Sequence, residues 1–392
     1  MHARAQNPTR QSRPNPSQPI VEWLEQRQAE IQHVIRELVV RESPSHDKAS
    51  VDALGRYICD LFRAAGASPK LHKTEKFGDH LQADFEGVGE RVLLLGHFDT
   101  VWDLGTLKTM PFREERGRLW GPGVLDMKTG IVQMLFAIEA LQAVRGGLSR
   151  PVTVLLVTDE EVGSESSRAI TESLAKGCAA VFVLEPSFGL QGALKTSRKG
   201  VGDYTVRVQG KASHAGLDFE KGASAILELS RQLLQVEKFT DLASGVTVNP
   251  GVIRGGTRNN VIAAEASADV DMRITKLAQA SSLDKKFRAL KPIDKRCKLS
   301  VEGGVNRPPL ERTQAVAQLF AKAKQLGNEL GLKLKEASVG GGSDGNFTGA
   351  LGIPTLDGLG APGEGAHATN ESVIVDQIVP RTALLARLIE EV

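Results

Sequence analysis

The chain has 392 residues, of which 41% are hydrophobic and 24% charged, and its formal net charge at pH 7 is only +2. A chain of this length can form two domains, and so small a charge gives no reason to expect a nucleic-acid or membrane partner. Three cysteines lie far apart without a CxxC pair, which argues against both a disulfide framework and a cysteine metal site.

The first twenty residues are polar and rich in proline, and they lack the apolar stretch of a secretory signal. We therefore expect residues 1–20 to form a disordered tail. No apolar run approaches the roughly 20 residues that a membrane span requires. A cytoplasmic location is the resulting expectation.

The next part of the chain alternates between helical and strand patterns. Apolar residues recur at helical spacing over 21–41 and again over 50–64. The unbroken apolar run over 92–95 predicts a strand buried on both faces, as in a parallel sheet. There follow a helix over about 128–144, a strand over 152–157, a helix over about 166–175 and the strand AAVFVLEPS. This order predicts an α/β domain whose mostly parallel sheet is covered by helices.

The pattern changes near residue 199. YTVRVQGKASH, VTVNPGVIRGG and ASADVDMRIT alternate apolar and polar residues, as half-exposed antiparallel strands do, and helical stretches cover about 222–238 and 276–290. From about Pro308 the α/β pattern returns, with helices over 313–328 and 378–391. We therefore predict a discontinuous first domain over 21–198 and 308–392, with an inserted α+β domain over 199–307.

Side chains that can bind metals stand where the predicted buried strands end. In an α/β sheet, these strand ends and the loops after them form the binding site. Two histidines and five acids occupy such places: His97, Asp99, Asp126, Glu160, Glu161, Glu185 and His367. Histidine and carboxylate ligands suit zinc or a similar divalent ion, and the groups suffice for two ions bridged by a shared carboxylate.

Each of these residues also has an ordinary structural explanation. A lone histidine at a strand end is more often just a polar residue, Asp126 alone could form a turn or cap a helix, and Glu185 could simply end a strand. A structural calcium site is disfavoured by the two histidines. The joint placement of the seven residues is what favours a catalytic metal centre.

The motifs GHFDTV, GPGVLDMKTG, TDEEVGS, EPS, GKASHAG and GGGSDG, followed by a late histidine, occur in this order and cover nearly the whole chain after the tail. They resemble the M20 family of metallopeptidases, and within it the bacterial glutamate carboxypeptidases. The resemblance implies two zinc ions per subunit, with Co²⁺ or Mn²⁺ as alternative metals. It implies that His97 and Glu185 bind one ion, that Glu161 and His367 bind the other, and that Asp126 bridges both.

The resemblance also implies catalytic roles. Glu160 is expected to be the general base that takes a proton from water and delivers it to the leaving amine. Asp99 is expected to accept a hydrogen bond from the His97 imidazole and to orient it. His214 is expected to stabilise the oxyanion from the other subunit, so the resemblance implies a homodimer formed through the inserted domain. Without the family pattern, His214 would be interpreted as a surface residue on an edge strand.

A substrate that ends in an α-carboxylate suits the forked guanidinium of arginine. Arg273 in DVDMRI and Asn260 in GGTRNNVI fall where the family binds this carboxylate. Arg307 matches a further basic position of the glutamate-specific members, although it could equally be a solvated loop residue. Gly342 in GGGSDG is expected to bring the backbone close to the substrate.

Several residues have no firm place in this pattern. Lys195 is only a guess for another basic residue of the site, and Asp159 has no assigned catalytic role. Val339 stands where the glutamate carboxypeptidases have a hydroxyl residue, which leaves the preference for glutamate open. Four histidines match no ligand motif and are expected at the surface: His33, His46, His72 and His80.

The sequence thus predicts a di-zinc hydrolase that releases a C-terminal amino acid, glutamate by resemblance, from an N-acyl or peptidyl substrate. The alternative is an N-acyl-amino-acid deacylase or a dipeptidase on the same scaffold. A binding protein that merely keeps the fold would be expected to have lost Glu160 or a ligand, and all of these residues are present.

Overall fold

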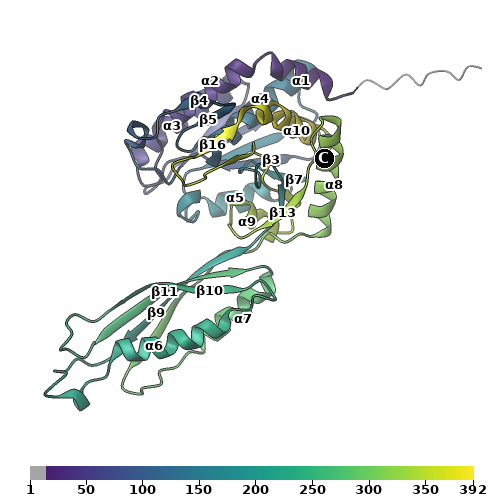
Figure 1. The fold of residues 1–392 in the computed structure, drawn as a ribbon. Helices are drawn as coiled ribbons and strands as arrows, with labels where there is room; N and C mark the ends of the chain where they lie inside the picture. The colour runs from purple at the N-terminus through teal and green to yellow at the C-terminus, as the bar shows by residue number, and fades with distance from the viewer. Residues whose placement is uncertain (1–14) are drawn as a thin grey trace, which may run out of the picture.

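The structure is a computed structural model that describes residues 15–392. Figure 1 shows a larger lobe, which holds both ends of the described chain, and a smaller, elongated lobe. Helix α1 (Gln18–Glu25) begins the larger lobe, with a proline in its first turn. Residues 18–20 are therefore helical rather than part of a tail, and the prediction for residues 1–14 lies outside the described residues.

A six-stranded sheet forms the centre of the larger lobe. Its strands are β1 (Ser68–His72), β2 (His80–Phe85), β3 (Val92–His97), β6 (Val152–Val157), β7 (Ala180–Val183) and β14 (Thr355–Leu356), in the spatial order β1-β2-β6-β3-β7-β14. β3 pairs in parallel with β6 and β7, and β7 with β14, whereas β2 is antiparallel to both of its neighbours. The predicted α/β fold with a mostly parallel sheet is confirmed.

Helices cover both faces of this sheet. One face packs against α1, α2 (Gln28–Val39), α3 (Lys48–Ala64), α4 (Thr129–Arg145), α8 (Gln314–Glu329) and α10 (Ile378–Glu391), and the other against α5 (Arg168–Ala175) and α9 (Gly345–Ala350). Within β3, Val92 and Leu94 belong to the first core, whereas Leu93 and Leu95 belong to the second. The strand is therefore buried on both faces, as its unbroken apolar run predicted.

The single helical stretch predicted over 21–41 is two helices, α1 and α2, which meet at Arg27. Arg27 has φ −113° and ψ 12°, outside the helical range. Its guanidinium carbon lies 3.9 Å from the centroid of the Trp23 ring, and its Nη1 donates to the Trp23 carbonyl oxygen at 3.2 Å. The helical spacing of the apolar residues was read correctly, but periodicity alone does not reveal a break of one or two residues.

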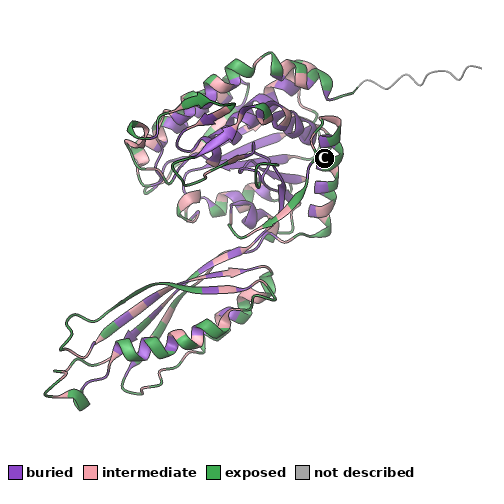
Figure 2. Ribbon diagram, in the orientation of Figure 1, coloured by how far each residue is buried: buried purple, intermediate pink, exposed green. Residues whose placement is uncertain are grey.

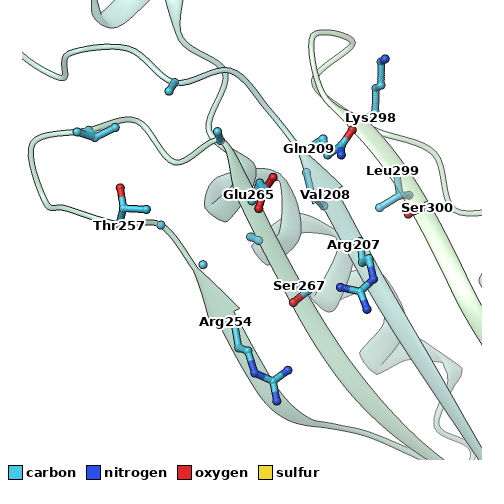
Figure 3. A pocket seen from close by; sticks show the side chains of 16 residues that line it. Arg207, Val208, Gln209, Arg254, Thr257, Glu265, Ser267, Lys298, Leu299 and Ser300 are labelled. Atoms are coloured by element: carbon cyan, nitrogen blue, oxygen red, sulfur yellow. The ribbon is translucent and has the colours of Figure 1, made fainter.

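The smaller lobe contains a four-stranded antiparallel sheet in the order β10-β11-β9-β12. Its strands are β9 (Gly200–Gln209), β10 (Thr247–Gly255), β11 (Glu265–Ile274) and β12 (Lys298–Arg307), and α6 (Ala225–Val236) and α7 (Leu277–Arg288) cover one face. Along β9 and β11, buried residues alternate with exposed or half-buried ones, as the neighbours Val208 and Arg207 do (Figure 3), whereas β3 and β6 at the centre of the larger lobe are buried throughout (Figure 2). The expected inserted α+β segment is present, and its exact domain boundaries stay predictions.

Short strands complete the fold. β8 (Leu194–Arg198) pairs in parallel with β13 (Glu336–Val339), and a small sheet contains β4 (Arg113–Glu115), β5 (Arg118–Trp120), β15 (Gly363–Glu364) and β16 (Ser372–Ile374). β9 follows β8 almost directly, and Val201 on β9 is aligned with Arg273 on one side and with Arg307 on the other. The chain enters the smaller lobe at the start of β9 and leaves it at the end of β12, so both connections between the lobes lie beside Val201.

In the part of the chain that the structure describes, no helix combines the length and the apolar character needed to cross a membrane. The cytoplasmic location stays a prediction.

Candidate metal centre

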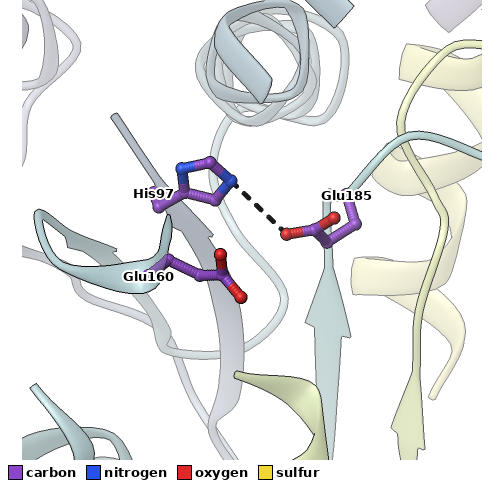
Figure 4. A group of neighbouring side chains, drawn as sticks. All are labelled: His97, Glu160 and Glu185. Atoms are coloured by element: carbon purple, nitrogen blue, oxygen red, sulfur yellow. Dashed lines mark ion pairs between the residues drawn. The ribbon is translucent and has the colours of Figure 1, made fainter. Parts of the chain in front are cut away.

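Three adjacent parallel strands, β6, β3 and β7, end side by side in the larger lobe. β3 ends with His97, Glu160 and Glu161 form a short 3₁₀ turn after β6, and Glu185 follows two residues after β7. In Figure 4, His97, Glu160 and Glu185 point toward one another. Each offers a ligand atom within 4.8 Å of the others. The ends of these three strands therefore bring together residues that are far apart in the chain.

Asp126 joins this group from the loop after β5 and lies between the two histidines. Its Oδ1 is 3.1 Å from His97 Nε2, and its Oδ2 is 3.4 Å from His367 Nε2. His97 Nε2 is also 3.5 Å from Glu185 Oε1, while His367 Nε2 is 3.2 Å from Glu161 Oε2. The arrangement has two halves that share Asp126, with the same pairs that the sequence assigned to two ions.

The donor set of these two halves fits a divalent cation. Imidazole nitrogens and carboxylate oxygens are ordinary zinc ligands. Glu161 Oε1 is buried and has no hydrogen-bond partner among the described residues. A buried carboxylate oxygen without a partner is costly, and neighbouring carboxylates repel one another, so a bound cation would relieve both penalties. The residues present therefore fit a divalent cation.

The carboxylates around the two histidines control their protonation. Burial by itself lowers the pKa of His97, but contacts with Asp126 and further carboxylates raise it well above its ordinary value. Contacts with Asp126 and Glu161 raise the pKa of His367 to about 10. A histidine must lose its proton before it can bind a metal. A metal ion that binds here would have to displace the protons of both imidazoles.

Glu160, the expected general base, faces Arg307 from β12. Arg307 Nη2 lies 3.0 Å from Glu160 Oε1, donates to the Glu160 carbonyl oxygen at 2.9 Å, and lies 3.2 Å from Asp344 Oδ1. Burial raises the pKa of Glu160 well above its ordinary value, although the charge of Arg307 opposes this shift. A carboxylate with a raised pKa is a better proton acceptor near neutral pH. Arg307 ends β12 and its side chain is only 11% exposed, so its interpretation as a solvated loop residue is wrong.

Asp99 lies beside His97, but its contacts differ in detail from those expected. His97 Nδ1 is 3.0 Å from the carbonyl oxygen of Asp99 and 3.5 Å from its carboxylate Oδ1. The carboxylate Oδ2 instead accepts from Ser45 Oγ at 2.7 Å and from the Glu161 backbone N–H at 3.3 Å. The main chain of Asp99 thus orients the imidazole, while its side chain holds the turn that carries Glu161.

Asp159, which had no assigned role, closes the same turn. Its Oδ2 accepts from the Ser166 backbone N–H and hydroxyl, both at 2.7 Å, and from the Ser167 backbone N–H at 3.3 Å. His80 lies beside this network, with Nε2 3.0 Å from Ser166 Oγ and Nδ1 3.0 Å from Thr158 Oγ1. His80 is fully buried, so the prediction of a surface residue is wrong. Neither Asp159 nor His80 contacts the metal-ligand atoms, and both stabilise the turn that carries Glu160 and Glu161.

Arg198 was missed in the sequence analysis and lies directly behind Glu185. Its guanidinium donates to Asp357 at 2.7 and 2.9 Å, to Glu185 Oε2 at 3.3 Å and to the Gly342 carbonyl oxygen at 2.9 Å. Both Arg198 and Asp357 are buried. β8 has the mostly polar sequence LKTSR, which gives no sign that Arg198 is buried, and the sequence contains no clue to its partner 159 residues away.

Two other expected site residues support this region rather than face the ligand atoms. Lys195 lies on β8, where its backbone N–H donates to the Asp357 carbonyl oxygen at 2.8 Å, and burial lowers the pKa of its ammonium group. A Cβ on Gly342 would lie 3.2 Å from both Arg307 Cδ and Val201 Cγ2. Gly342 therefore allows the backbone to pack closely against the Arg307 side chain.

His214 and Asn260 lie at the opposite end of the smaller lobe from the metal centre. β9 runs from Gly200, beside the larger lobe, to Gln209, and nine residue steps of a strand span roughly 30 Å. His214 follows Gln209 and is exposed, and the backbone N–H of the next residue, Ala215, donates to the Asn260 carbonyl oxygen at 3.0 Å. Within one described chain, neither residue has a contact with the ligand atoms.

Arg273 lies at the near end of the smaller lobe, in the row of Val201 and Arg307. Its guanidinium is engaged by Asp271, with Nε and Nη2 2.8 to 3.0 Å from the carboxylate oxygens. A substrate carboxylate would have to compete with Asp271 for this guanidinium.

Comparison with known proteins gives a match to the model of peptidase family M20/M25/M40 over residues 93–391. Carboxypeptidase G2 of Pseudomonas sp. (strain RS-16) is 30% identical, over 91% of this chain and 87% of that protein.

Among solved structures, aminopeptidase PepT of Bacillus cereus has a TM-score of 0.79 at 21% identity, over 93% of this chain and 98% of that one. The YXEP protein of Bacillus subtilis, described as a dinuclear metal-binding peptidase, has a TM-score of 0.71 at 13% identity, over 93% and 98% of the two chains. At these identities the two structures establish a shared fold.

Proposed function

This chain belongs to peptidase family M20/M25/M40 and is a hydrolase, and we propose that it releases a C-terminal amino acid from an N-acyl or peptidyl substrate. We propose glutamate as that amino acid, and two zinc ions as the metals. Carboxypeptidase G2, with which the similarity extends over most of both chains, supports a carboxypeptidase rather than an aminopeptidase reaction.

The observation that carries this proposal is the position of Asp126. One carboxylate oxygen faces the His97 half of the centre and the other faces the His367 half, at 3.1 and 3.4 Å from the two imidazoles. A carboxylate shared in this way is the ligand that a two-metal site requires. When bound, two divalent ions activate water as a nucleophile and stabilise negative charge on a substrate carbonyl oxygen.

Glu160 supplies the proton transfer in this proposal. A carboxylate oxygen of Glu160 lies within 4.8 Å of a ligand atom of His97 and of Glu185. Glu160 is nevertheless not one of the residues that form the two halves sharing Asp126. Its raised pKa favours uptake of the proton of the attacking water and its return to the leaving amine. Arg307 holds one carboxylate oxygen of Glu160 at 3.0 Å and so keeps the base directed at the centre.

We propose that Arg273 and Asn260 bind the α-carboxylate of the substrate and that His214 stabilises the oxyanion. His214 and Asn260 lie far from the ligand atoms of their own chain, so this proposal requires a homodimer in which one subunit's smaller lobe completes the other's site. β10 lies at the edge of its sheet, and Val252 and Ile253 on it are 45% and 59% exposed. An edge strand with exposed apolar side chains offers unpaired backbone groups, which supports pairing between two copies.

A substrate panel tests the reaction. We expect purified protein loaded with zinc to release glutamate from a folyl-glutamate substrate faster than it cleaves N-acetyl amino acids or dipeptides. A deacylase would leave folyl-glutamate untouched and cleave the N-acetyl amino acids, and a dipeptidase would favour the dipeptides. Protein treated with a chelator is the control, and it should be inactive on every substrate.

A mixing experiment tests the homodimer. Glu160→Ala and His214→Ala proteins are each expected to be nearly inactive, but a mixed dimer would contain one site with both residues intact. After subunit exchange in an equal mixture, about one quarter of the sites should be complete. No recovery of activity after demonstrated exchange would contradict the assignment of His214 to the partner's site.

A further inference from the structure

Glu371 is a buried acid in the loop between β15 and β16, four residues after His367. Its side chain is fully shielded from solvent. Oε2 accepts from Trp102 Nε1 at 2.8 Å and from the Gly123 backbone N–H at 2.9 Å. Oε1 accepts from the backbone N–H groups of Leu125 and Asp126, at 2.9 and 3.1 Å. The two oxygens therefore receive four hydrogen bonds.

Three of these four donors belong to the loop that presents Asp126. Residues Val124–Lys128 of this loop form an irregular helical turn in which the φ and ψ of Asp126 are not helical. The turn follows Gly123 at φ 72°, a conformation that favours glycine. The Gly121 backbone N–H also donates to the Glu371 carbonyl oxygen, at 3.3 Å. One residue thus ties the loop of the shared carboxylate to the loop of His367, and a shift of either loop would change the distance between Asp126 and His367.

We propose that Glu371 is a positioning residue, which sets the separation of Asp126 and His367 and thereby the metal affinity of the centre. This inference rests on the proposed metal centre. Partners that orient metal ligands typically contribute 10- to 100-fold to metal affinity or activity, because they fix the geometry before the ion binds. Glu371 acts through the backbone of Asp126, so it does not itself need to touch an ion or a substrate.

The alternative is that Glu371 only stabilises the fold, and the chain offers a matched control for this possibility. Glu228 on α6 is also fully buried, and its carboxylate accepts from the backbone N–H groups of Ile293 and Asp294 at 2.8 and 2.9 Å and from Gln232 Nε2 at 2.7 Å. It lies in the smaller lobe, in the core that α6 and α7 form. The same Glu→Gln change can therefore be made at two similar buried carboxylates, of which only one joins the ligand loops.

The experiment compares full-length wild-type, Glu371→Gln and Glu228→Gln proteins after removal of metal. Zinc affinity is measured by competition with a chromophoric chelator, at a temperature where melting curves show all three folded. We expect Glu371→Gln to lower zinc affinity by about 10- to 100-fold and Glu228→Gln to leave it within about twofold, even though both lower the melting temperature. Equal zinc affinity of all three proteins, or an equal loss in both variants, would overturn the inference.

Two further measurements keep the test decisive. The visible spectrum of bound Co²⁺ should change in Glu371→Gln but not in Glu228→Gln, because the spectrum follows ligand geometry. If Glu371→Gln does not fold, Trp102→Phe removes one donor to Glu371 and should weaken zinc binding by less than tenfold, yet more than Glu228→Gln does; unchanged affinity there would refute the inference. Failure of the wild-type protein to bind zinc would instead refute the proposed metal centre.

Discussion

The candidate functional residues at the metal centre and those at the far end of the smaller lobe differ in burial and in the contacts that hold them. At the centre, His97, Asp126 and Glu161 are enclosed, and contacts of 3.1 to 3.5 Å connect the ligand atoms of each half. At the far end, His214 and Asn260 are exposed, and their loops contact mainly each other. The first group is held in place by contacts within one chain, whereas the second would be completed by a partner subunit in the homodimer that we propose.

This difference teaches which part of the machinery one chain can build alone. Preorganised ligands lower the cost of binding an ion, because their repulsion and orientation are settled during folding. His367 is also exposed, but Asp126 and Glu161 of its own chain hold it, whereas His214 would gain its proposed role only when a second subunit meets it. The four predictions that follow test this contrast, beginning with the largest expected effect.

Replacing the shared carboxylate should have the largest effect. Asp126→Ala removes the side chain whose two oxygens lie 3.1 and 3.4 Å from His97 and His367, and we expect both metal ions and nearly all hydrolysis to be lost. Metal content after dialysis, measured by atomic absorption, checks this result. Retention of two ions per chain would show that the two halves do not depend on Asp126. His214→Ala, at the far end, is the comparison and should keep its metal.

Removing the base should separate chemistry from metal binding. We expect Glu160→Ala to keep both ions and to lose about 10²- to 10⁴-fold in kcat, the usual contribution of general acid–base catalysis. Metal analysis and steady-state kinetics on the same preparation check the two parts. A variant with nearly wild-type turnover would remove Glu160 from the proton transfer.

A smaller loss is expected at the far end. His214→Ala should lower kcat by about 10²- to 10³-fold, the range reported for removal of one oxyanion donor, without a change in zinc affinity. Kinetics and chelator competition measure the two effects. Unchanged turnover would exclude His214 from the reaction and would make the exposed end of the smaller lobe a surface without a catalytic role.

The smallest expected effect is on stability, and it compares a shielded carboxylate in the larger lobe with a less shielded one in the smaller lobe. Asp79 in the larger lobe is shielded and accepts from Lys48 at 2.8 Å and from Lys73 at 2.5 Å, and its pKa is about 2 although burial opposes this lowering. Its stabilisation is present above pH about 4 and is lost as the pH falls toward 2. We expect Asp79→Asn to lower the free energy of unfolding by about 1 to 2 kcal/mol at pH 7 and by less at pH 3.

Urea unfolding at both pH values measures this change. Asp294 in the smaller lobe also has a pKa of about 2, because of its contacts with Arg296, but Asp294 is only half-buried and the Arg296 side chain is 60% exposed. Asp294→Asn should therefore leave the unfolding midpoint close to that of the wild-type protein. An equal loss in both variants would show that burial does not distinguish the two lobes in this respect.

Local patterns in the sequence were sufficient for most of the fold. The unbroken apolar run of β3 predicted a strand covered on both faces, and the helices over 128–144 and 313–328 were predicted within one residue of α4 and α8. Patterns were insufficient where long-range contacts decide the outcome. His80 is buried because Thr158 and Ser166 satisfy both of its nitrogens, and these partners come from a different strand and its following loop.

The sequence by itself determined the types of ligand and their order along the chain, because chemistry selects histidine and carboxylates and buried strands must end where the apolar runs end. It also indicated the family through motifs that span nearly the whole chain. Only the tertiary structure decided that Asp126 faces both histidines, that Arg198 lies behind Glu185 and that Glu371 links two ligand loops. These distances depend on the strand order β6-β3-β7 and on contacts between loops that are more than 200 residues apart in the sequence. A local sequence pattern carries no information about such long-range contacts.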